Sequence, residues 1–359
     1  MTELNRVTTL VLVGDARPEH IGTHFLHAGR ELGLTIHFAE VREARGSSIM
    51  RRIGWHLAGR RPGRLGQFSR RVLDICARYK PDVLLTTGFA PVTAGSLNRI
   101  GSLGIYRINY LTDDPWNPAQ HAPWFLQALK EYDEVLSTRR ANMGDLGTLG
   151  CKRVGYLPFG FAPDLYFPEH LSPERNSELE TDIMFAGGAD TDRLPYITAL
   201  AGAGFHVGLY GMYWERFAET RELARGFQSP TIVRAAVAAA KVVLCLVRRA
   251  NRDGTCMRTF EVPAVGACML VEKTGEHLDL FGPEGQAVLY FDNIPEMIEK
   301  TRWLLDHPTE RERLNAAAHR LIVGGEHTYR DRLAAIIQCA DASRSVSGRV
   351  RQLQPTCLE

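Results

Sequence analysis

Residues 7–38, VTTLVLVGDARPEHIGTHFLHAGRELGLTIHF, contain a β-branched apolar run, a helical pattern and a second apolar run. The first run covers residues 7–13 and ends at Gly14, and the apolar residues of 20–32 recur at the spacing of an amphipathic helix. Strand, helix and strand in this order predict a parallel sheet, because parallel neighbours are joined through a crossover helix.

The same order of elements recurs in both halves of the chain. A length of 359 residues suits two α/β domains of roughly 150 residues each, with a cleft between them. The fold predicted is therefore α/β, with two doubly wound, Rossmann-like domains. Further strands are predicted near residues 82–86, 105–110, 134–136 and 153–156 in the first half, and near 182–186, 205–210, 242–247, 268–271 and 287–291 in the second.

Proline, glycine and charged residues interrupt this pattern at residues 157–164 and 172–180. We place the domain boundary in this region, because few regular elements fit such a composition. The predicted division is a first domain at 1–165, a second at 166–325, a C-terminal helix at 326–342 that packs back toward the first domain, and a disordered tail at 343–359.

Composition argues against several classes of protein. The formal net charge of +2 argues against binding to nucleic acid. The seven cysteines are spread along the chain without a C-x-x-C pair, which argues against a disulfide framework or a zinc knuckle and suits a reducing cytosol. We see neither signal-peptide character at the N-terminus nor an apolar run long enough to cross a membrane. The expected location is cytoplasmic.

Arginine is concentrated in residues 42–71, a segment with nine arginines and a single acid, Glu43. Such a segment can dock weakly on an anionic membrane, where each basic residue contributes about 1 kcal/mol. It can equally be a solvated loop. The charge pattern leaves both open, so the protein is expected in the cytoplasm, with peripheral contact at the inner face of the membrane as one possibility.

Residues 251–266, NRDGTCMRTFEVPAVG, join a buried strand to a helix. A helix N-terminus attracts phosphate, because its free N–H groups and its dipole both favour an anion. Gly254 leaves room for close backbone approach, Arg258 can bind a pyrophosphate, and Glu261 can accept hydrogen bonds from ribose hydroxyls. The pattern predicts a nucleotide site.

Both acids of this segment also have a structural interpretation. Asp253 can cap the helix, since aspartate before a helical run commonly accepts a free N–H. Glu261 lies among apolar residues and can pair with Arg258 on the preceding turn. These interpretations stay open beside the functional ones.

The same segment resembles a motif of a known enzyme family. Residues 257–261, Met-Arg-Thr-Phe-Glu, with Ala264 and Gly266 after them, resemble the core of the CgeB-like (spore-maturation protein) branch of the group-1 GT-B glycosyltransferases. Asp253 and Glu261 have the spacing of that family's acid-x7-acid motif, with aspartate where the family usually has glutamate. The shorter side chain reduces the reach of the first carboxylate.

Further similarities lie in the second half of the chain, whereas the first half matches only loosely. Residues 327–332, HTYRDR, are similar to the branch's closing H-T-Y-x-x-R pattern, and residues 158–168 look like its interdomain linker. Residues 185–188, Phe-Ala-Gly-Gly, with Arg193, are similar to the glycine loop that opens the donor domain. On their own, the two glycines are as typical of an ordinary turn.

The resemblance implies that the second domain binds a nucleoside-diphosphate sugar. In the family the second acid holds the donor ribose and the first approaches the donor sugar, which assigns Glu261 to the ribose and makes Asp253 a candidate catalytic residue. Enzymes of this kind neutralise the leaving diphosphate with a helix dipole and basic side chains, so no metal and no other cofactor is expected. The expected donor-binding residues are Gly187, Gly188, Arg193, Tyr210, Gly211, Gly254, Thr255, Cys256, Met257, Arg258 and Glu261.

The first domain is then expected to bind the acceptor. Residues 111–116, Leu-Thr-Asp-Asp-Pro-Trp, follow a predicted strand and are similar to an acidic D-D-P loop of the branch, although Asp-Asp-Pro is also a common turn. Asp113 is a candidate catalytic base, if the enzyme inverts, because it can deprotonate an acceptor hydroxyl. The expected acceptor-binding residues are Gly14, Asp15, His24, Asp114 and Trp116.

The expected activity is metal-independent transfer of a sugar, of the hexosyltransferase type, from a nucleoside-diphosphate sugar to a hydroxyl of a glycan, glycolipid, protein or small molecule. One alternative is a nucleotide-sugar epimerase of the same fold, which needs only donor and water. Another is a homologue that binds a nucleotide or sugar without catalysis. A dinucleotide-dependent oxidoreductase fits less well, because no G-x-G-x-x-G follows the first strand of either half.

Overall fold

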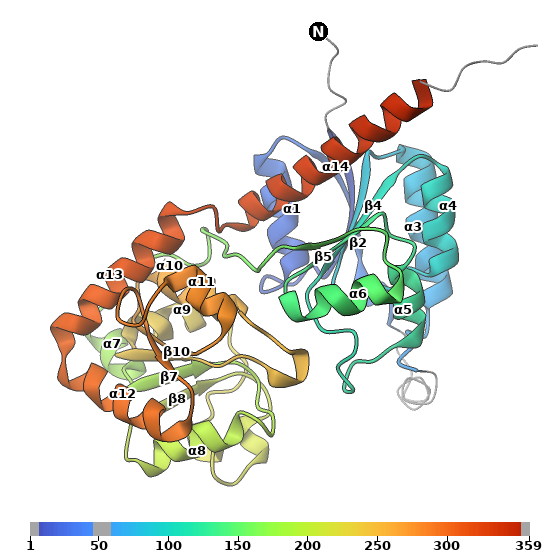
Figure 1. Ribbon diagram of the computed structural model, residues 1–359. Helices are drawn as coiled ribbons and strands as arrows, with labels where there is room; N and C mark the ends of the chain where they lie inside the picture. The colour runs from blue at the N-terminus through green and yellow to red at the C-terminus, as the bar shows by residue number, and fades with distance from the viewer. Residues whose placement is uncertain (1–6, 46–58, 353–359) are drawn as a thin grey trace, which may run out of the picture. The chain divides into compact units, whose positions relative to one another are not determined.

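The computed structural model describes residues 7–45 and 59–352 of the chain. Contacts divide it into two compact units (Figure 1). The first unit comprises Met1–Pro158 together with the chain from Tyr329, and the second comprises Phe159–Thr328. The division therefore falls before the boundary at 165 that the sequence suggests, because residues 159–165 pack with the second unit.

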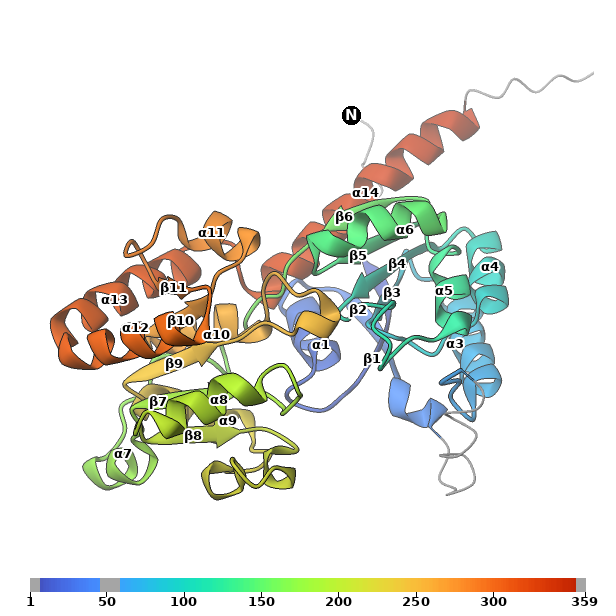
Figure 2. The same ribbon diagram turned by 60° about the horizontal axis from the view of Figure 1, so that its bottom comes forward.

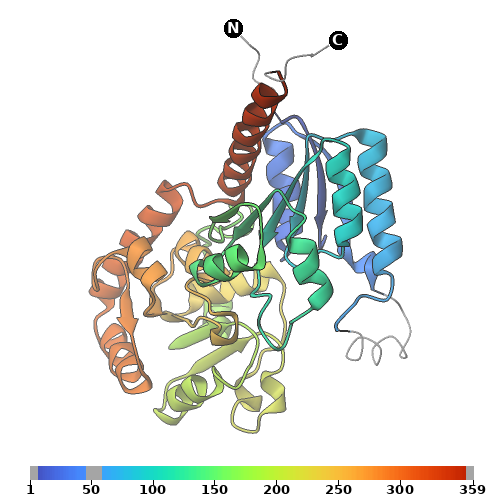
Figure 3. The same cartoon turned by 45° about the vertical axis from the view of Figure 1, so that its right-hand side comes forward.

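The first unit is built on a six-stranded sheet with strand order β2-β1-β3-β4-β5-β6, and every pair in it is parallel. Helices lie on both faces of this sheet (Figure 3). Its strands are β1 (Thr9–Gly14), β2 (Thr35–Glu40), β3 (Val83–Thr87), β4 (Tyr106–Leu111), β5 (Glu134–Ser137) and β6 (Val154–Tyr156). Its helical elements are α1 (Ile21–Glu31), η1 (Val41–Ala44), α3 (Leu65–Tyr79), α4 (Ala94–Ser102), α5 (Pro123–Leu129), η2 (Arg140–Asn142), α6 (Met143–Leu149) and α14 (Tyr329–Gln352).

The second unit is built on a five-stranded parallel sheet with strand order β11-β10-β9-β7-β8. Two of its helices, α12 and α13, lie side by side (Figure 2). Its strands are β7 (Ile183–Ala186), β8 (Val207–Tyr210), β9 (Val242–Cys245), β10 (Met269–Glu272) and β11 (Leu289–Phe291). Its helical elements are α7 (Pro173–Leu179), α8 (Leu194–Gly202), η3 (Trp214–Arg216), η4 (Arg221–Leu223), α9 (Pro230–Ala239), η5 (Arg249–Asn251), α10 (Met257–Val265), α11 (Gly275–Phe281), α12 (Ile294–Asp306) and α13 (Pro308–Gly324).

The central strands of both sheets are buried along most of their length. Leu10–Val13 of β1 and Val242–Cys245 of β9 are at most 1% exposed. Such continuous apolar runs are expected where helices cover both faces of a parallel sheet. The predicted fold class, α/β with two doubly wound sheets, is confirmed.

Two segments differ from the sequence-based prediction. The polar run 172–180 is not a break between domains, because it contains α7, where Ser172 caps the helix through Arg175 N at 3.2 Å. Leu179 of this helix packs against α9. At the end of the chain, α14 continues to Gln352, beyond the predicted helix end at 342, while residues 353–359 lie outside the described part.

Most of the predicted membrane-docking segment, 42–71, is described, but residues 46–58 lie outside the described part. Among the described arginines, Arg42 pairs with Glu40 at 3.5 Å and Arg71 pairs with Glu43. In the parts that the structure describes, no helix combines the length and the apolar character needed to cross a membrane. Contact with an anionic membrane stays a prediction.

Candidate functional site

The strand order of the second unit reverses between β7 and β9. From β7 the chain adds β8 on one side, and then β9 and β10 on the other. Ligands of open parallel sheets bind outside the carboxyl ends of the strands at such a switch point. The two segments that the sequence indicates as donor-binding both follow these strands: the glycine loop follows β7, and residues 251–266 follow β9.

The glycine loop is bonded to the end of β8. Gly187 N donates to Tyr210 O at 2.8 Å, and Trp214 Nε1 donates to Gly187 O at 2.8 Å. Gly211 has a φ of +146°, and a Cβ atom there would lie 2.2 Å from Gly187 O. The backbones thus approach as closely as only glycine permits, and four predicted donor-binding residues, Gly187, Gly188, Tyr210 and Gly211, are brought together.

Arg193 lies at the switch point and is not a solvated helix residue. Its side chain donates through Nη1 to Gly188 O at 3.2 Å and through Nη2 to Leu246 O at 3.4 Å, which links the loop after β7 to the end of β9. The residue is 7% exposed. Burial, followed by repulsion from Arg248, lowers the pKa of the guanidinium. A cation is therefore held where an anion would bind.

Asp253 belongs to the loop before α10 and does not cap that helix. Its carboxylate accepts from Arg248 N at 3.2 Å, and its own N–H donates to Arg248 O at 3.2 Å. The helix begins at Met257, and its N-cap residue is Cys256. The capping interpretation of Asp253 is therefore wrong for α10.

The N-terminus of α10 is fixed by a buried chain of hydrogen bonds. His277 Nδ1 lies 2.8 Å from Glu272 O, which can only accept, so His277 carries its proton on Nδ1. His277 Nε2 therefore accepts from Thr259 Oγ1 at 2.9 Å, and Thr259 Oγ1 in turn accepts from Cys256 N at 3.1 Å. Burial lowers the pKa of His277 to about 4, which keeps the imidazole neutral.

A second thiol lies beside this chain. Cys245, at the end of β9, has its Sγ atom 3.7 Å from that of Cys256. The contact with Cys245 lowers the pKa of the Cys256 thiol and raises that of its neighbour. Cys245 is buried in an apolar strand, and its contact with the start of α10 could not be predicted from sequence.

Glu261 is buried and pairs with Arg258 on the preceding turn. Its side chain is 1% exposed. Arg258 also donates through Nε to Ala186 O, at the end of β7, at 3.3 Å, and through Nη1 to Tyr166 Oη at 3.4 Å. The predicted pairing of Glu261 with Arg258 is thus present, and it places both side chains near the switch point.

Three buried side chains of this region carry polar atoms without a hydrogen-bond partner in the described part of the chain. They are Thr255 Oγ1, Arg193 Nε and the carboxylate oxygens of Glu261, which have only the ion pair with Arg258. A buried polar atom left unpaired costs about 1–3 kcal/mol. A bound ligand with hydroxyl and phosphate groups could form hydrogen bonds with these atoms and so remove this cost.

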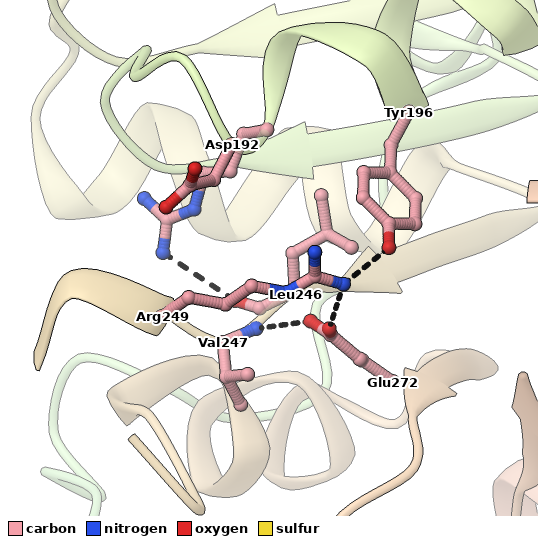
Figure 4. A pocket seen from close by; sticks show the side chains of 7 residues that line it. Asp192, Tyr196, Leu246, Val247, Arg249 and Glu272 are labelled. Atoms are coloured by element: carbon pink, nitrogen blue, oxygen red, sulfur yellow. Dashed lines mark hydrogen bonds and ion pairs between the residues drawn. The ribbon is translucent and has the colours of Figure 1, made fainter. Parts of the chain in front are cut away.

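A shallow pocket next to Arg193 contains residues that sequence reasoning missed (Figure 4). Glu272, at the end of β10, accepts from Val247 N at 3.0 Å and from Arg249 Nη2 at 2.9 Å, and Arg249 also donates to Tyr196 Oη. The rule that ligands lie at carboxyl ends of strands would have indicated Glu272, because it follows the predicted strand 268–271. No feature of the sequence marks Tyr166 as a site residue, because it contacts Arg258 only through the fold.

In the first unit, the strand order reverses at β1, where Gly14 and Asp15 follow. A Cβ atom on Gly14 would lie 2.7 Å from Gly22 Cα. Asp15 is 8% exposed and pairs with Arg17 at 2.8 Å, and the hydrogen bonds to Arg17 outweigh burial and lower the pKa of Asp15 to about 2. His24 is 4% exposed and stacks on Tyr329 of α14 at 4.8 Å, so it contributes to packing.

The Asp-Asp-Pro loop separates its two carboxylates. Asp114 is 1% exposed and accepts from Trp116 N at 2.9 Å and Asn142 Nδ2 at 3.0 Å. Asp113 is half-buried and accepts from Thr112 Oγ1 at 3.2 Å. Trp116 packs partly against the core of this unit. Asp114 thus orders the loop, which leaves Asp113 as the better placed acid for chemistry.

No group of three or more histidine, cysteine, aspartate or glutamate side chains with the geometry of a metal site occurs in residues 7–45 and 59–352.

Residues 193–338 match a protein-family model described as glycosyl transferase-like. This match begins at Arg193 and includes the whole of the segment 251–266. A comparison with curated proteins finds no match.

Solved structures resemble the chain over almost its whole length. Sucrose-phosphate synthase from Thermosynechococcus elongatus is 12% identical with a TM-score of 0.65, and covers 94% of this chain and 100% of its own. A glycosyltransferase from Rickettsia africae is 11% identical with a TM-score of 0.63, at 94% and 98% coverage. The HepE protein of Anabaena in complex with UDP is 12% identical with a TM-score of 0.61, at 92% and 100% coverage.

These likenesses define the class of the fold. The two parallel, Rossmann-like sheets are those of the GT-B glycosyltransferases. Within that class, the glycosyl transferase-like match supports sugar transfer in general terms. The match does not reach the finer level of the CgeB-like branch that the motifs resemble.

Proposed function

We propose that the protein transfers a sugar from a nucleoside-diphosphate sugar to a hydroxyl-bearing acceptor, as a member of the CgeB-like branch of GT-B glycosyltransferases. The observation that carries this proposal is a set of buried polar side chains at the switch point of the second sheet: Thr255 Oγ1 and Arg193 Nε make no hydrogen bond in the described part of the chain, and the Glu261 carboxylate makes none beyond its ion pair with Arg258. The solved structure of HepE with UDP and the glycosyl transferase-like match over this region support it.

In this proposal the donor lies along the carboxyl ends of β7 and β9. Glu261 accepts hydrogen bonds from the ribose hydroxyls, because its carboxylate makes no hydrogen bond in the described part of the chain beyond the ion pair with Arg258. The diphosphate lies at the N-terminus of α10, where the free N–H groups and the dipole favour an anion. Arg258 and Arg193 add positive charge, and Asp253 orients the donor sugar.

The reaction breaks the bond between the anomeric carbon and the diphosphate oxygen and forms a bond from that carbon to the acceptor oxygen. The negative charge that develops on the leaving diphosphate is stabilised by α10 and the arginines, a form of catalysis that is strongest where water is excluded. In an inverting reaction the proton of the acceptor hydroxyl goes to Asp113. We propose that no metal is required, because these groups already supply positive charge.

The first unit holds the acceptor in this scheme, with Asp113, Asp15 and Trp116 near the carboxyl ends of β1 and β4. The acceptor itself is proposed only as a hydroxyl compound. We also propose a cytoplasmic location, with contact to the inner face of the membrane through the arginine-rich segment 42–71.

Nucleotide titration of matched variants tests the donor assignment. Calorimetry with nucleoside diphosphates is expected to show binding to the wild type and a loss of affinity in Glu261→Ala of at least tenfold, about 1.4 kcal/mol. Glu310→Ala, which removes an exposed partner of Arg313, is the control and should bind like the wild type. Equal affinity in wild type and Glu261→Ala would refute the ribose assignment.

Product analysis then separates transfer from its alternatives. A product formed from donor and water alone would favour the epimerase, and donor binding with neither hydrolysis nor transfer to any acceptor would favour a non-catalytic homologue. Activity that persists in excess chelator supports the metal-independent scheme, and activity that is lost and then restored by a divalent cation contradicts it.

A further inference from the structure

The segment after β8 holds an aromatic residue in an unusual backbone conformation. Tyr213 has φ 79° and ψ −4°, in the left-handed region, and is 40% exposed. This conformation is costly for a bulky side chain and is normally occupied by glycine or asparagine. Such an outlier persists where the surrounding structure imposes it, and it is a reason to look for a function.

The residues on both sides of Tyr213 are fixed to the glycine loop. Met212 O accepts from Ala189 N at 2.9 Å, and Trp214, which is fully buried, donates through Nε1 to Gly187 O at 2.8 Å. Tyr213 is therefore held between two anchors on the loop that begins the proposed donor site. Its neighbours also explain why the strained backbone does not relax.

The ring of Tyr213 is itself held in place. The guanidinium carbon of Arg216 lies 4.0 Å from the ring centroid, and Arg216 N donates to Tyr213 O at 3.2 Å. A cation over one face orients the ring, and the exposed two-fifths of the residue remains accessible to solvent. An oriented, exposed aromatic ring is a surface on which a flat ligand can stack.

We propose that Tyr213, oriented by Arg216, is the platform on which the nucleobase of the donor stacks. This inference rests on the proposed function, which assigns the ribose to Glu261 and the diphosphate to α10 but leaves the base without a contact. Stacking on an aromatic side chain is tolerant of base identity, because every nucleobase has a π-face. Tyr213 therefore contributes affinity for the nucleoside, and selection among bases falls to other groups.

Two substitutions at this position distinguish the contribution of the ring from that of the backbone conformation. Tyr213→Gly removes the ring, and glycine adopts the left-handed conformation without steric cost, so the variant keeps its fold. Tyr213→Phe keeps the ring and removes only the hydroxyl. Trp303→Ala is the matched control, because Trp303 is a similarly exposed aromatic of α12, 38% exposed and stacked on His307 at 4.5 Å.

Calorimetry with uridine, guanosine and adenosine diphosphates, and with inorganic pyrophosphate as a ligand without a base, tests the inference. We expect Tyr213→Gly to bind the nucleoside diphosphates about 5- to 150-fold more weakly, with unchanged affinity for pyrophosphate. Tyr213→Phe and Trp303→Ala should bind all of these ligands with an affinity within about twofold of the wild type.

The outcomes distinguish this inference from the proposed function. If the wild type binds none of the nucleoside diphosphates, the proposed function fails and the platform with it. If the wild type binds them and Tyr213→Gly binds them equally well, only the platform is wrong. An equal loss for nucleoside diphosphates and pyrophosphate also overturns it, because the ring would then act on the loop and not on the base.

Discussion

Arg258 and Glu261 form an ion pair one turn apart in α10, and the glutamate of this pair is almost completely buried. Burying two charges is costly, and the cost is offset only while both partners are present. In this pair the arginine also donates to Ala186 O and Tyr166 Oη, whereas the glutamate oxygens make no hydrogen bond beyond the ion pair in the described part of the chain. The pair therefore has two roles: it stabilises the fold, and it positions a carboxylate that can bind a ligand.

A double substitution distinguishes the structural role of the pair from its role in ligand binding. Arg258→Met leaves a buried carboxylate without its partner and should destabilise the protein by about 3–5 kcal/mol. Combining Arg258→Met with Glu261→Met removes both charges and should restore much of the stability, yet nucleotide binding should remain lost. Urea denaturation and calorimetry measure the two effects. Nucleotide binding by the double variant would contradict the role of the pair in the donor site.

The acid stability of the second unit should depend on His277. Burial lowers its pKa to about 4, below the ordinary value of about 6.5. Between these values the unfolded chain binds more protons than the folded one, so stability is present above pH 6.5 and falls as pH is lowered toward 4. The full effect is about 3 kcal/mol. Protonation would also remove the acceptor of Thr259 Oγ1 and loosen the start of α10.

Urea denaturation at pH 7 and pH 5 measures this dependence. His277→Gln should be less sensitive to the change in pH than the wild type, whereas His307→Gln, at the exposed position between α12 and α13, should behave like the wild type. His20 of the first unit, whose pKa burial also lowers, contributes in the same direction and is present in every variant. An unchanged pH dependence in His277→Gln would show that another group dominates.

Much of this fold could be predicted from sequence because its signals are local. The strand predicted at residues 182–186 is observed at Ile183–Ala186, and the helical pattern at residues 20–32 is observed as α1, Ile21–Glu31. Apolar runs and helical spacing are properties of neighbouring residues. The helix α7 was missed because its seven residues are mostly polar and bury only one side chain, Leu179.

The candidate site was predictable only in part, for the same reason. The segment 251–261 could be recognised because its residues are contiguous. The contact of Arg258 with Tyr166 joins residues far apart in sequence, and only the fold reveals it. Local rules also misled, since aspartate is preferred at an N-cap but Cys256 occupies that position in α10.

Two glycines of the donor site should respond differently to alanine. In Gly211→Ala the new Cβ would lie 2.2 Å from the backbone oxygen of Gly187, at a φ of +146°. This variant should be destabilised by more than about 2 kcal/mol. In Gly254→Ala the Cβ would lie 2.0 Å from the carboxyl carbon of Glu276, which is the end of a flexible side chain and can move.

Gly254→Ala should therefore keep its stability within about 1 kcal/mol. Its nucleotide affinity should nevertheless fall, because the added methyl group occupies the space in which the backbone approaches the phosphates. Thermal unfolding and calorimetry test both variants together. Wild-type nucleotide affinity in Gly254→Ala would remove this glycine from the donor site.

The two aspartates of the Asp-Asp-Pro loop should respond differently to substitution. Asp114→Ala would leave Trp116 N and Asn142 Nδ2 without their shared acceptor, at a cost of about 1–3 kcal/mol, and Asp114→Asn, which keeps an oxygen there, should recover most of this stability. Asp113→Asn should leave stability and nucleotide affinity unchanged but slow transfer by about 10²–10⁴-fold, because its carboxylate takes the acceptor proton. Transfer at the wild-type rate in Asp113→Asn would assign the base to another group or indicate a retaining reaction.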